Sequence, residues 1–266
     1  MTDMLFLLQH EPTYLNFCVT FFALVAGSFL NAAAHRLPIL WGVITVSPPA
    51  PPGRFSMLGR SQCPHCDYVI PWYQNLPVIS YLMLGGRCHQ CSAPIPRSYF
   101  IVELFTPLSA LMLAEYFGPE YGLVLLGGVL LLSWLLILMA LIDFNALVVP
   151  RPLNLALIFG GVLWHTLHAR ELPIDFVSGA ILGYLMLSAI SWCASKCFGQ
   201  QAMGGGDVLM FAGTGAWVGL NNIVDALWLS AAVGLALWFA LGRPHHIPFA
   251  PAIGLTTFCF FLVNFG

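Results

Sequence analysis

The sequence predicts an all-α polytopic membrane protein with about eight transmembrane helices and a small cysteine-rich insertion between the first two. Of the 266 residues, 59% are hydrophobic and only 8% are charged, so one soluble core could not bury the apolar surface. The apolar residues fall in stretches of about 17 to 22 residues, near the length that a helix needs to cross a bilayer. Two C-x-x-C pairs separate the first two stretches.

The predicted helices cover residues 13–35, 98–117, 122–142, 152–168, 176–195, 208–224, 226–242 and 247–266. We expect the first of them to remain as an anchor, because no basic segment precedes it and it is long enough to span. These helices divide the chain into an N-terminal anchor (1–36), a cytoplasmic four-cysteine domain (37–97) and a membrane-embedded core (98–266).

The basic residues orient the predicted helices. Eight of the nine fall on one side of an eight-span threading, and the positive-inside rule assigns that side to the cytoplasm. Both termini are then expected on the opposite side. The eight residues are Arg36, Arg54, Arg60, Arg87, Arg97, Arg151, Lys196 and Arg243, and only Arg170 lies on the other side.

The insertion carries the sequences CPHC (63–66) and CHQC (88–91), with twenty-one residues between them. Two such pairs supply four thiolates for a tetrahedral zinc ion, and four sulfur ligands leave no open position for water. Cys63, Cys66, Cys88 and Cys91 therefore predict a structural Zn²⁺ site. Redox-active pairs and unmetallated thiols are the alternatives, and His65 or His89 could replace a thiolate ligand.

Two acidic residues lie at the same membrane edge of the predicted topology. Asp143 ends the third predicted helix, and Asp207 opens the sixth. Ionisable groups at membrane depth are costly and usually face a partner or water. Two neighbouring carboxyl groups share a proton, so one can act as a base on water while the other polarises a peptide carbonyl. Asp143 and Asp207 therefore predict an aspartyl peptidase centre, without indicating which is acid and which is base.

Three glycines, Gly204, Gly205 and Gly206, precede Asp207 directly. Without side chains there, an extended substrate strand could approach the acid closely. The alternative reading is structural, because an aspartate at a helix N-terminus is a common cap and suits the helix dipole.

Five ordered blocks resemble the bacterial type IV prepilin peptidase family, which is similar to intramembrane aspartyl proteases of the G-x-G-D class. They are GSFLNAAAHRLP (27–38), the two cysteine pairs with GGRCHQCSAPIPRSYFIVEL (85–104), LID (141–143), GGGD (204–207) and IPFAPAIGL (247–255). The resemblance implies catalysis by Asp143 and Asp207. It also implies prepilin or pseudopilin substrates, whose basic leader is cut at the cytoplasmic face of the bacterial inner membrane, and N-methylation with S-adenosylmethionine.

Two positions depart from the family pattern. Arg151 replaces an acid, and Leu209 replaces a lysine after G-x-G-D. The departures keep open a non-catalytic assembly factor, and paired membrane acids also suit a proton-coupled transporter. Glu103 has two interpretations, a role in methyl transfer or an interfacial acid paired with Arg97 or Arg87. The sequence has no nucleotide-binding glycine fingerprint and no basic patch for nucleic acid. It does not indicate the S-adenosylmethionine site or the oligomeric state.

Overall fold

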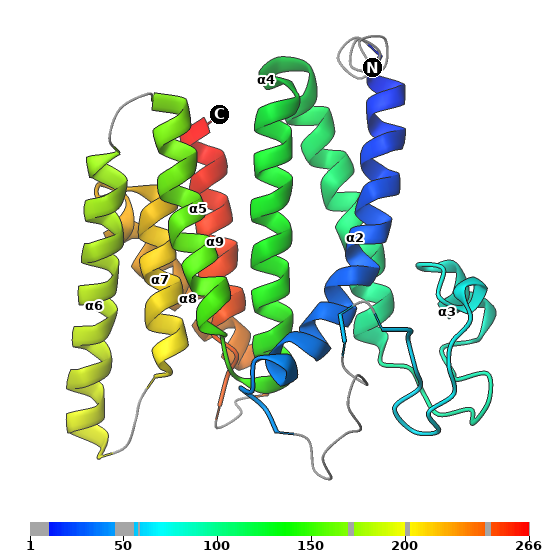
Figure 1. Cartoon of the computed structure of the whole chain (residues 1–266). Coiled ribbons are helices and arrows are strands. Elements are labelled where there is room, and N and C mark those ends of the chain that lie inside the picture. The colour runs from blue at the N-terminus through cyan, green and yellow to red at the C-terminus, as the bar shows by residue number, and fades with distance from the viewer. Residues whose placement is uncertain are drawn as a thin grey trace. The chain divides into compact units, whose positions relative to one another are not determined.

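A computed structural model describes residues 11–45, 56–57, 59–169, 173–199, 203–242 and 246–265 (Figure 1). Three of the basic residues that oriented the predicted topology, Arg54, Arg170 and Arg243, lie outside the described residues. The described elements are helices joined by loops and two isolated bridges, which confirms the all-α prediction. The chain folds as two compact units, Met1–Trp134 and Leu135–Gly266.

Each of the eight predicted membrane segments falls on a helix. Among the described residues, five helical segments are long and apolar enough to cross a membrane: Pro12–Leu40, Arg97–Gly118, Gly122–Ala146, Ile174–Cys197 and Ile223–Ala240. The other three predicted segments fall on α5 (Arg151–Ala169), α7 (Gly205–Val218) and α9 (Ala250–Phe265). These lengths and compositions make the protein a multi-pass membrane protein.

In the first unit, α2 (Pro12–Leu40) packs against the start of α4 (Arg97–Ala146). The contact is close because Gly27 lies against Thr106, where an added Cβ would come within 3.2 Å of the threonine side chain. Asn31, on the same face of α2, donates a hydrogen bond to the Tyr99 carbonyl at 3.2 Å. Small residues and side-chain amides of this kind hold helices together where no water separates them.

The chain reverses direction within α4. Gly122 has φ 79° and ψ 170°, which a helix does not allow. Glycine adopts positive φ without steric cost. The element is therefore a hairpin of two helices, Arg97–Gly118 and Gly122–Ala146. Between α2 and α4 lie the cysteine insertion, the short η1 (Trp72–Gln74) and α3 (Ile79–Met83).

In the second unit, α7 is the central helix, and it packs against α5, α6 (Ile174–Phe198), α8 (Ile223–Ala240) and α9. Ten of its residues are buried: Val208, Met210, Phe211, Ala212, Gly213, Thr214, Gly215, Ala216, Trp217 and Val218. In Figure 1, α4 ends, and α5, α7 and α9 begin, at the same end of this unit. That end brings together the segments on which the predicted acids lie.

The central helix α7 is shorter than the sequence predicts. It begins at Gly205 and ends at Val218, whereas the predicted segment covers 208–224. The early end has a local cause, because Gly219 adopts φ 80° and the chain then turns before α8 begins at Ile223. Fourteen residues rise only about 21 Å, less than the roughly 30 Å of a bilayer's hydrocarbon core.

The close approach of α5 to α7 generates a stability prediction. A Cβ added at Gly161 would lie 2.6 Å from the Ala216 carbonyl oxygen, which is backbone and cannot rotate away. We expect Gly161→Ala to lower the free energy of unfolding by about 1 to 3 kcal/mol, measured by unfolding of the purified protein in detergent. Gly127→Ala is the matched control, because no atom lies within 4 Å of its added Cβ. A Gly161→Ala protein as stable as this control would contradict the close packing.

Candidate functional site

Asp143 lies in the last turn of α4 and is only 4% exposed. One of its carboxyl oxygens, Oδ2, accepts a hydrogen bond of 2.9 Å from the backbone amide of Ala250. Ala250 is the first residue of α9, so its amide has no carbonyl partner within its own helix. The carboxyl group of Asp143 thus satisfies a helix start 107 residues further along the chain, where the helix dipole favours negative charge.

Asp207 lies in the first turn of α7, three residues after the N-cap Gly204. The backbone amide of Gly204 donates toward its carboxyl group. An acid at this position that binds back to the N-cap amide is half of a capping box. Asp207 therefore does cap the start of α7. This capping leaves room for a chemical role, because a carboxyl group has further acceptor positions.

The two acids interact. Asp143 and Asp207 are close enough for the charge on Asp143 to act on the carboxyl group of Asp207. Both belong to the second unit, and each accepts from a backbone amide at the start of a helix. The structure thus brings together two carboxyl groups from positions sixty-four residues apart in the sequence. Such a pair can hold one shared proton and polarise a water molecule.

The three glycines before Asp207 have different surroundings. Nothing lies within 4 Å of a Cβ added at Gly205, so its surface is open. A Cβ at Gly204 would lie 3.3 Å from the Asp207 carboxyl oxygen, whereas one at Gly206 would lie 2.8 Å from the Val149 carbonyl oxygen. Gly206 is therefore small because the protein's own loop packs against it. Of the three glycines, Gly205 alone has open space beside it among the described residues.

Two residues that contact the segments carrying the acids were not predicted from the sequence. The carbonyl of Gly206 accepts a hydrogen bond of 3.1 Å from the side chain of Asn154, a fully buried residue in α5. Val149 lies in the loop between Asp143 and α5 and is also buried. An asparagine inside an apolar segment was the one available sign, because a buried amide needs a polar partner.

The two departures from the family pattern lie at the edge of this site. Arg151 is the first residue of α5 and is exposed, whereas Leu209 follows Asp207 in α7 and is half-buried. Neither change removes a carboxyl group or one of the two backbone amides described above.

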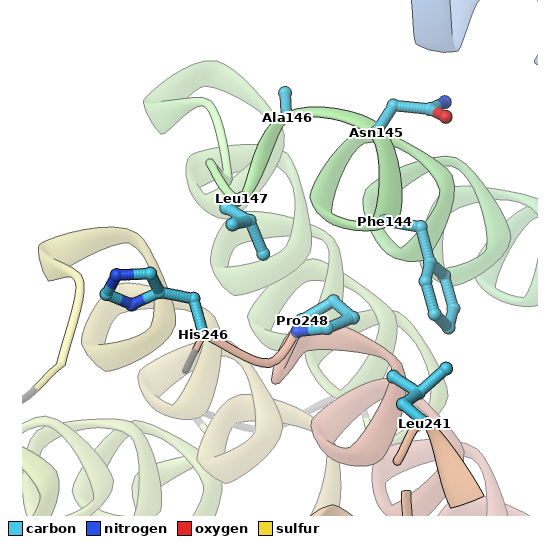
Figure 2. A pocket seen from close by; sticks show the side chains of 7 residues that line it. All are labelled: Phe144, Asn145, Ala146, Leu147, Leu241, His246 and Pro248. Atoms are coloured by element: carbon cyan, nitrogen blue, oxygen red, sulfur yellow. The ribbon is translucent and has the colours of Figure 1, made fainter. Parts of the chain in front are cut away.

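A hollow of about 470 Å³ is lined in part by Phe144, the residue after Asp143 in the chain. It is bounded by the end of α4, the end of α8 and the segment before α9, and Figure 2 shows Pro248 lying between Leu147 and Phe144. The described residues of its lining carry no carboxylate, ammonium or guanidinium group, and they are Phe144, Asn145, Ala146, Leu147, Leu241, His246 and Pro248. A hollow with this lining suits an apolar side chain with a few polar neighbours.

The insertion in the first unit contains two knuckles with the same hydrogen bonds. In the first, the Cys63 amide donates to the Tyr68 carbonyl and the Asp67 amide to the Cys63 carbonyl. In the second, the Cys88 amide donates to Ala93 and the Ser92 amide to Cys88. Asp67 and Ser92 occupy equivalent positions and both have positive φ, 54° and 58°. Each C-x-x-C pair therefore sits in its own closed turn.

The four cysteine sulfur atoms converge. Cys63, Cys66, Cys88 and Cys91 all have their sulfur atoms within 4.8 Å of one another, the arrangement of a group that could hold a metal ion. The Cys63–Cys91 and Cys66–Cys88 sulfur pairs are 3.8 and 4.0 Å apart. A tetrahedral ion with bonds of about 2.3 Å to sulfur needs sulfur atoms about 3.8 Å apart. The residues present therefore fit a four-thiolate metal site.

The thiols of this cluster differ in acidity. Backbone amides, chiefly that of Cys91, lower the pKa of Cys88 to about 7. The pKa of Cys66 is raised to about 12, because desolvation and the neighbouring thiols together outweigh the amide of Tyr68, which acts to lower it. Thiol ligands lose their protons when a metal binds.

Two polar residues attach the insertion to the helices of the first unit. The Arg36 guanidinium donates to the carbonyls of Ser56, Met57 and Gly59, where the chain enters the insertion. Glu103, only 9% exposed, accepts a hydrogen bond of 2.9 Å from the Val78 amide. Val78 is the N-cap of α3 and has φ 64°. Glu103 is therefore an acceptor for the insertion's backbone, a partner that the sequence did not indicate.

The fold and the site define a multi-pass helical membrane protein with an acid pair in its core and a four-cysteine insertion. The family model for the bacterial peptidase A24 N-terminal domain matches residues 21–117, and the model of the type IV leader peptidase family matches residues 130–239. The chain belongs to this family, as the sequence resemblance predicts.

Named relatives extend over nearly the whole chain. A prepilin leader peptidase/N-methyltransferase of Aeromonas hydrophila is 36% identical over 93% of this chain and 91% of its own length. That of Stutzerimonas stutzeri is 34% identical over 93% and 90%. A type 4 prepilin-like proteins leader peptide-processing enzyme of Escherichia coli is 34% identical over 93% of each. No solved structure matches the chain.

The contact between Asp143 and α9 generates a second prediction. Ala250→Pro removes the backbone N–H that donates to the Asp143 carboxyl group. Proline itself is tolerated at the first position of a helix. We expect this change to lower the free energy of unfolding by about 1.5 to 3 kcal/mol, the usual value of a hydrogen bond to a charged group. Any steric effect of the proline ring is separated by repeating the change in an Asp143→Ala protein. Equal losses in both backgrounds would contradict the contact.

Proposed function

We propose that this protein is a membrane aspartyl endopeptidase that removes the basic leader from type IV prepilins or pseudopilins. In this proposal Asp143 and Asp207 are the catalytic pair, and S-adenosylmethionine-dependent N-methylation of the new N-terminus follows. The observation that carries the proposal is that these two acids of the second unit lie near enough for the charge of one to act on the other. The names of relatives that align over 93% of the chain support the substrate and both activities.

The proposed hydrolysis uses the two carboxyl groups in different protonation states. The ionised one accepts a proton from water while the water oxygen bonds to the scissile carbonyl carbon. The protonated one donates a hydrogen bond to the carbonyl oxygen, where negative charge develops. In the tetrahedral intermediate a proton passes to the leaving nitrogen, the C–N bond breaks, and the pair again holds one proton. The open side of Gly205 and the hollow lined by Phe144 support the approach of an extended substrate there.

We propose that the acids face the cytoplasm and that the membrane is the bacterial inner membrane. In the second unit, Arg151 begins α5 and Lys196 lies in the last turn of α6, at the end of the unit where α4 stops and α7 starts. In the first unit, Arg87 belongs to the insertion and Arg97 starts α4. Basic residues gathered in this way mark cytoplasmic loops. The proposed functional segments remain an anchor at 1–36, a metal domain at 37–97 and a peptidase core at 98–266.

We propose Zn²⁺ for the cysteine cluster, held by Cys63, Cys66, Cys88 and Cys91. The sulfur spacings support a closed tetrahedral site, and bound zinc would join the two knuckles without supplying a reactive water. The described residues do not indicate a binding site for S-adenosylmethionine. The described lining of the hollow has no charged group that would hold the cofactor's charged headgroup.

The catalytic pair is tested by single Asp→Asn changes that keep the shape of each side chain. We expect Asp143→Asn and Asp207→Asn each to abolish cleavage of a co-expressed prepilin in membranes, because an amide can neither accept the water proton nor share one. Asp225→Asn, an exposed acid in the first turn of α8, is the matched control and should cleave normally. Cleavage is read from the mobility of the pilin on a gel.

Three outcomes of that experiment separate the candidate functions. Full cleavage by either Asp143→Asn or Asp207→Asn would refute the catalytic pair. Failure of the unmutated protein to cut any pilin tested would favour a non-catalytic assembly factor. Loss of cleavage in the Asp225→Asn control would show that any lost acid disturbs the membrane fold.

The metal prediction is a content of about one zinc ion per chain in the purified protein. Cys63→Ser should lower this content and the folded yield, and should reduce methylation more than the chemistry of cleavage, because the metal is structural. Cys193→Ser, at an exposed cysteine in α6, should change none of these. Metal analysis that finds no zinc in the unmutated protein would contradict the site.

A further inference from the structure

The side chain of Asn154 joins two helices beside the candidate catalytic pair. Asn154 is completely buried in the first turn of α5. Its amide nitrogen, Nδ2, donates a hydrogen bond of 3.1 Å to the carbonyl oxygen of Gly206 in α7. Gly206 is the residue directly before Asp207. The side chain of Asn154 thus ends one peptide unit from a proposed catalytic acid.

The helix α5 does not need this side chain for its own start. The backbone amides of Leu153 and Asn154 both donate to the carbonyl of Pro150, at 3.1 and 3.3 Å. The first turn of α5 is therefore closed by backbone groups. The amide side chain of Asn154 instead reaches a helix fifty-two residues further along the chain.

The other half of the amide argues against a role in stability. The side-chain oxygen Oδ1 of Asn154 is buried and has no hydrogen-bond partner in the described part of the structure. A buried polar atom without a partner costs free energy, whereas an apolar side chain of similar size, such as leucine, would avoid that cost. An asparagine at this position is better explained by what its Nδ2 group holds than by the stability that it adds.

Gly206 is held from two directions. The carbonyl oxygen of Val149 would lie 2.8 Å from a Cβ added at Gly206, so the loop that follows Asp143 packs directly on the first turn of α7. Asn154 binds the carbonyl group of the same glycine. The loop 147–150 and the start of α5 are the continuation of the chain from Asp143. Asn154 therefore ties the segment that carries one acid to the backbone that carries the other.

We propose that Asn154 is a positioning residue for the aspartyl centre: its hydrogen bond to Gly206 fixes the first turn of α7 and thereby keeps Asp207 opposite Asp143. This inference rests on the proposed peptidase function. It assigns Asn154 no contact with the substrate. A displacement of about 1 Å at a reacting group can cost on the order of 100-fold in rate, so a positioning contact of this kind acts on turnover and not on substrate binding.

The test compares Asn154→Leu with the unmutated protein in cleavage of a purified prepilin in detergent. Leucine keeps the approximate volume, removes the donor and removes the partnerless oxygen. We expect kcat to fall about 10- to 100-fold, KM to stay within about twofold of the unmutated value, and the unfolding temperature to stay the same or rise. Asn154→Ala carries the same kinetic expectation if the leucine protein does not fold.

The matched control is Thr166→Val in the same helix. The Thr166 hydroxyl donates only within α5, to the Val162 carbonyl at 2.7 Å, so its loss tests removal of a polar group from α5 without a link to α7. This control should keep its kcat. An equal fall of kcat in Thr166→Val, or an unchanged kcat in a folded Asn154→Leu protein, overturns the inference. Failure of both Asn154 variants to fold also overturns it, because the residue would then be structural.

Failure of the proposed function gives a different result in the same assay. The unmutated protein must cleave the prepilin and Asp207→Asn must not. If both proteins cleave the prepilin, or neither does, the peptidase assignment fails, and the inference about Asn154 fails because it rests on that assignment. If that pair behaves as expected, the Asn154 variants alone decide whether Asn154 positions Asp207.

Discussion

The hydrogen bond between the Asp143 carboxyl group and the Ala250 amide is the contact on which the second unit's site depends. It joins the end of α4 to the start of α9, two elements that are far apart in the chain. An acid at the C-terminal end of its own helix is opposed by that helix's dipole, so a carboxyl group there needs another source of stabilisation. The start of α9 supplies it, with a backbone donor and a helix dipole of the opposite sign.

The rest of the second unit places a second acid against the first. The helix α7 is buried along most of its length, and its glycines allow α5 and α6 to approach its backbone closely. Because Gly206 packs on Val149 and binds Asn154, the first turn of α7 has little freedom to move. Asp207 lies in that turn, so its position is fixed with it. The two acids are therefore held by backbone contacts on both sides, and the proposed catalysis would require such preorganisation.

The positions of the helices and the convergence of the four cysteines were predictable from the sequence, because composition and spacing are local signals. Apolar length predicts where the helices lie, and the C-x-x-C spacing predicts that the four sulfur atoms meet. The end of α7 at Val218 was not predictable, because the backbone conformation of Gly219 decides it inside a continuous apolar run. The partners of Asp143 and Asn154 are backbone groups of distant segments, and a backbone amide leaves no mark in a residue pattern. Gly206 shows the same limit, since its small size suits its own loop as well as an incoming chain.

The repeated knuckles of the insertion determine how it would respond to oxidation. Cys66 and Cys91 are exposed, so one sulfur atom of each knuckle meets the solvent. Each knuckle is closed by its own backbone hydrogen bonds. A thiol oxidant that displaces the ion would separate two intact turns and would not unravel either of them. Oxidation that stops at a sulfenic acid or a disulfide is reversed by thiols, so the two halves would then rejoin.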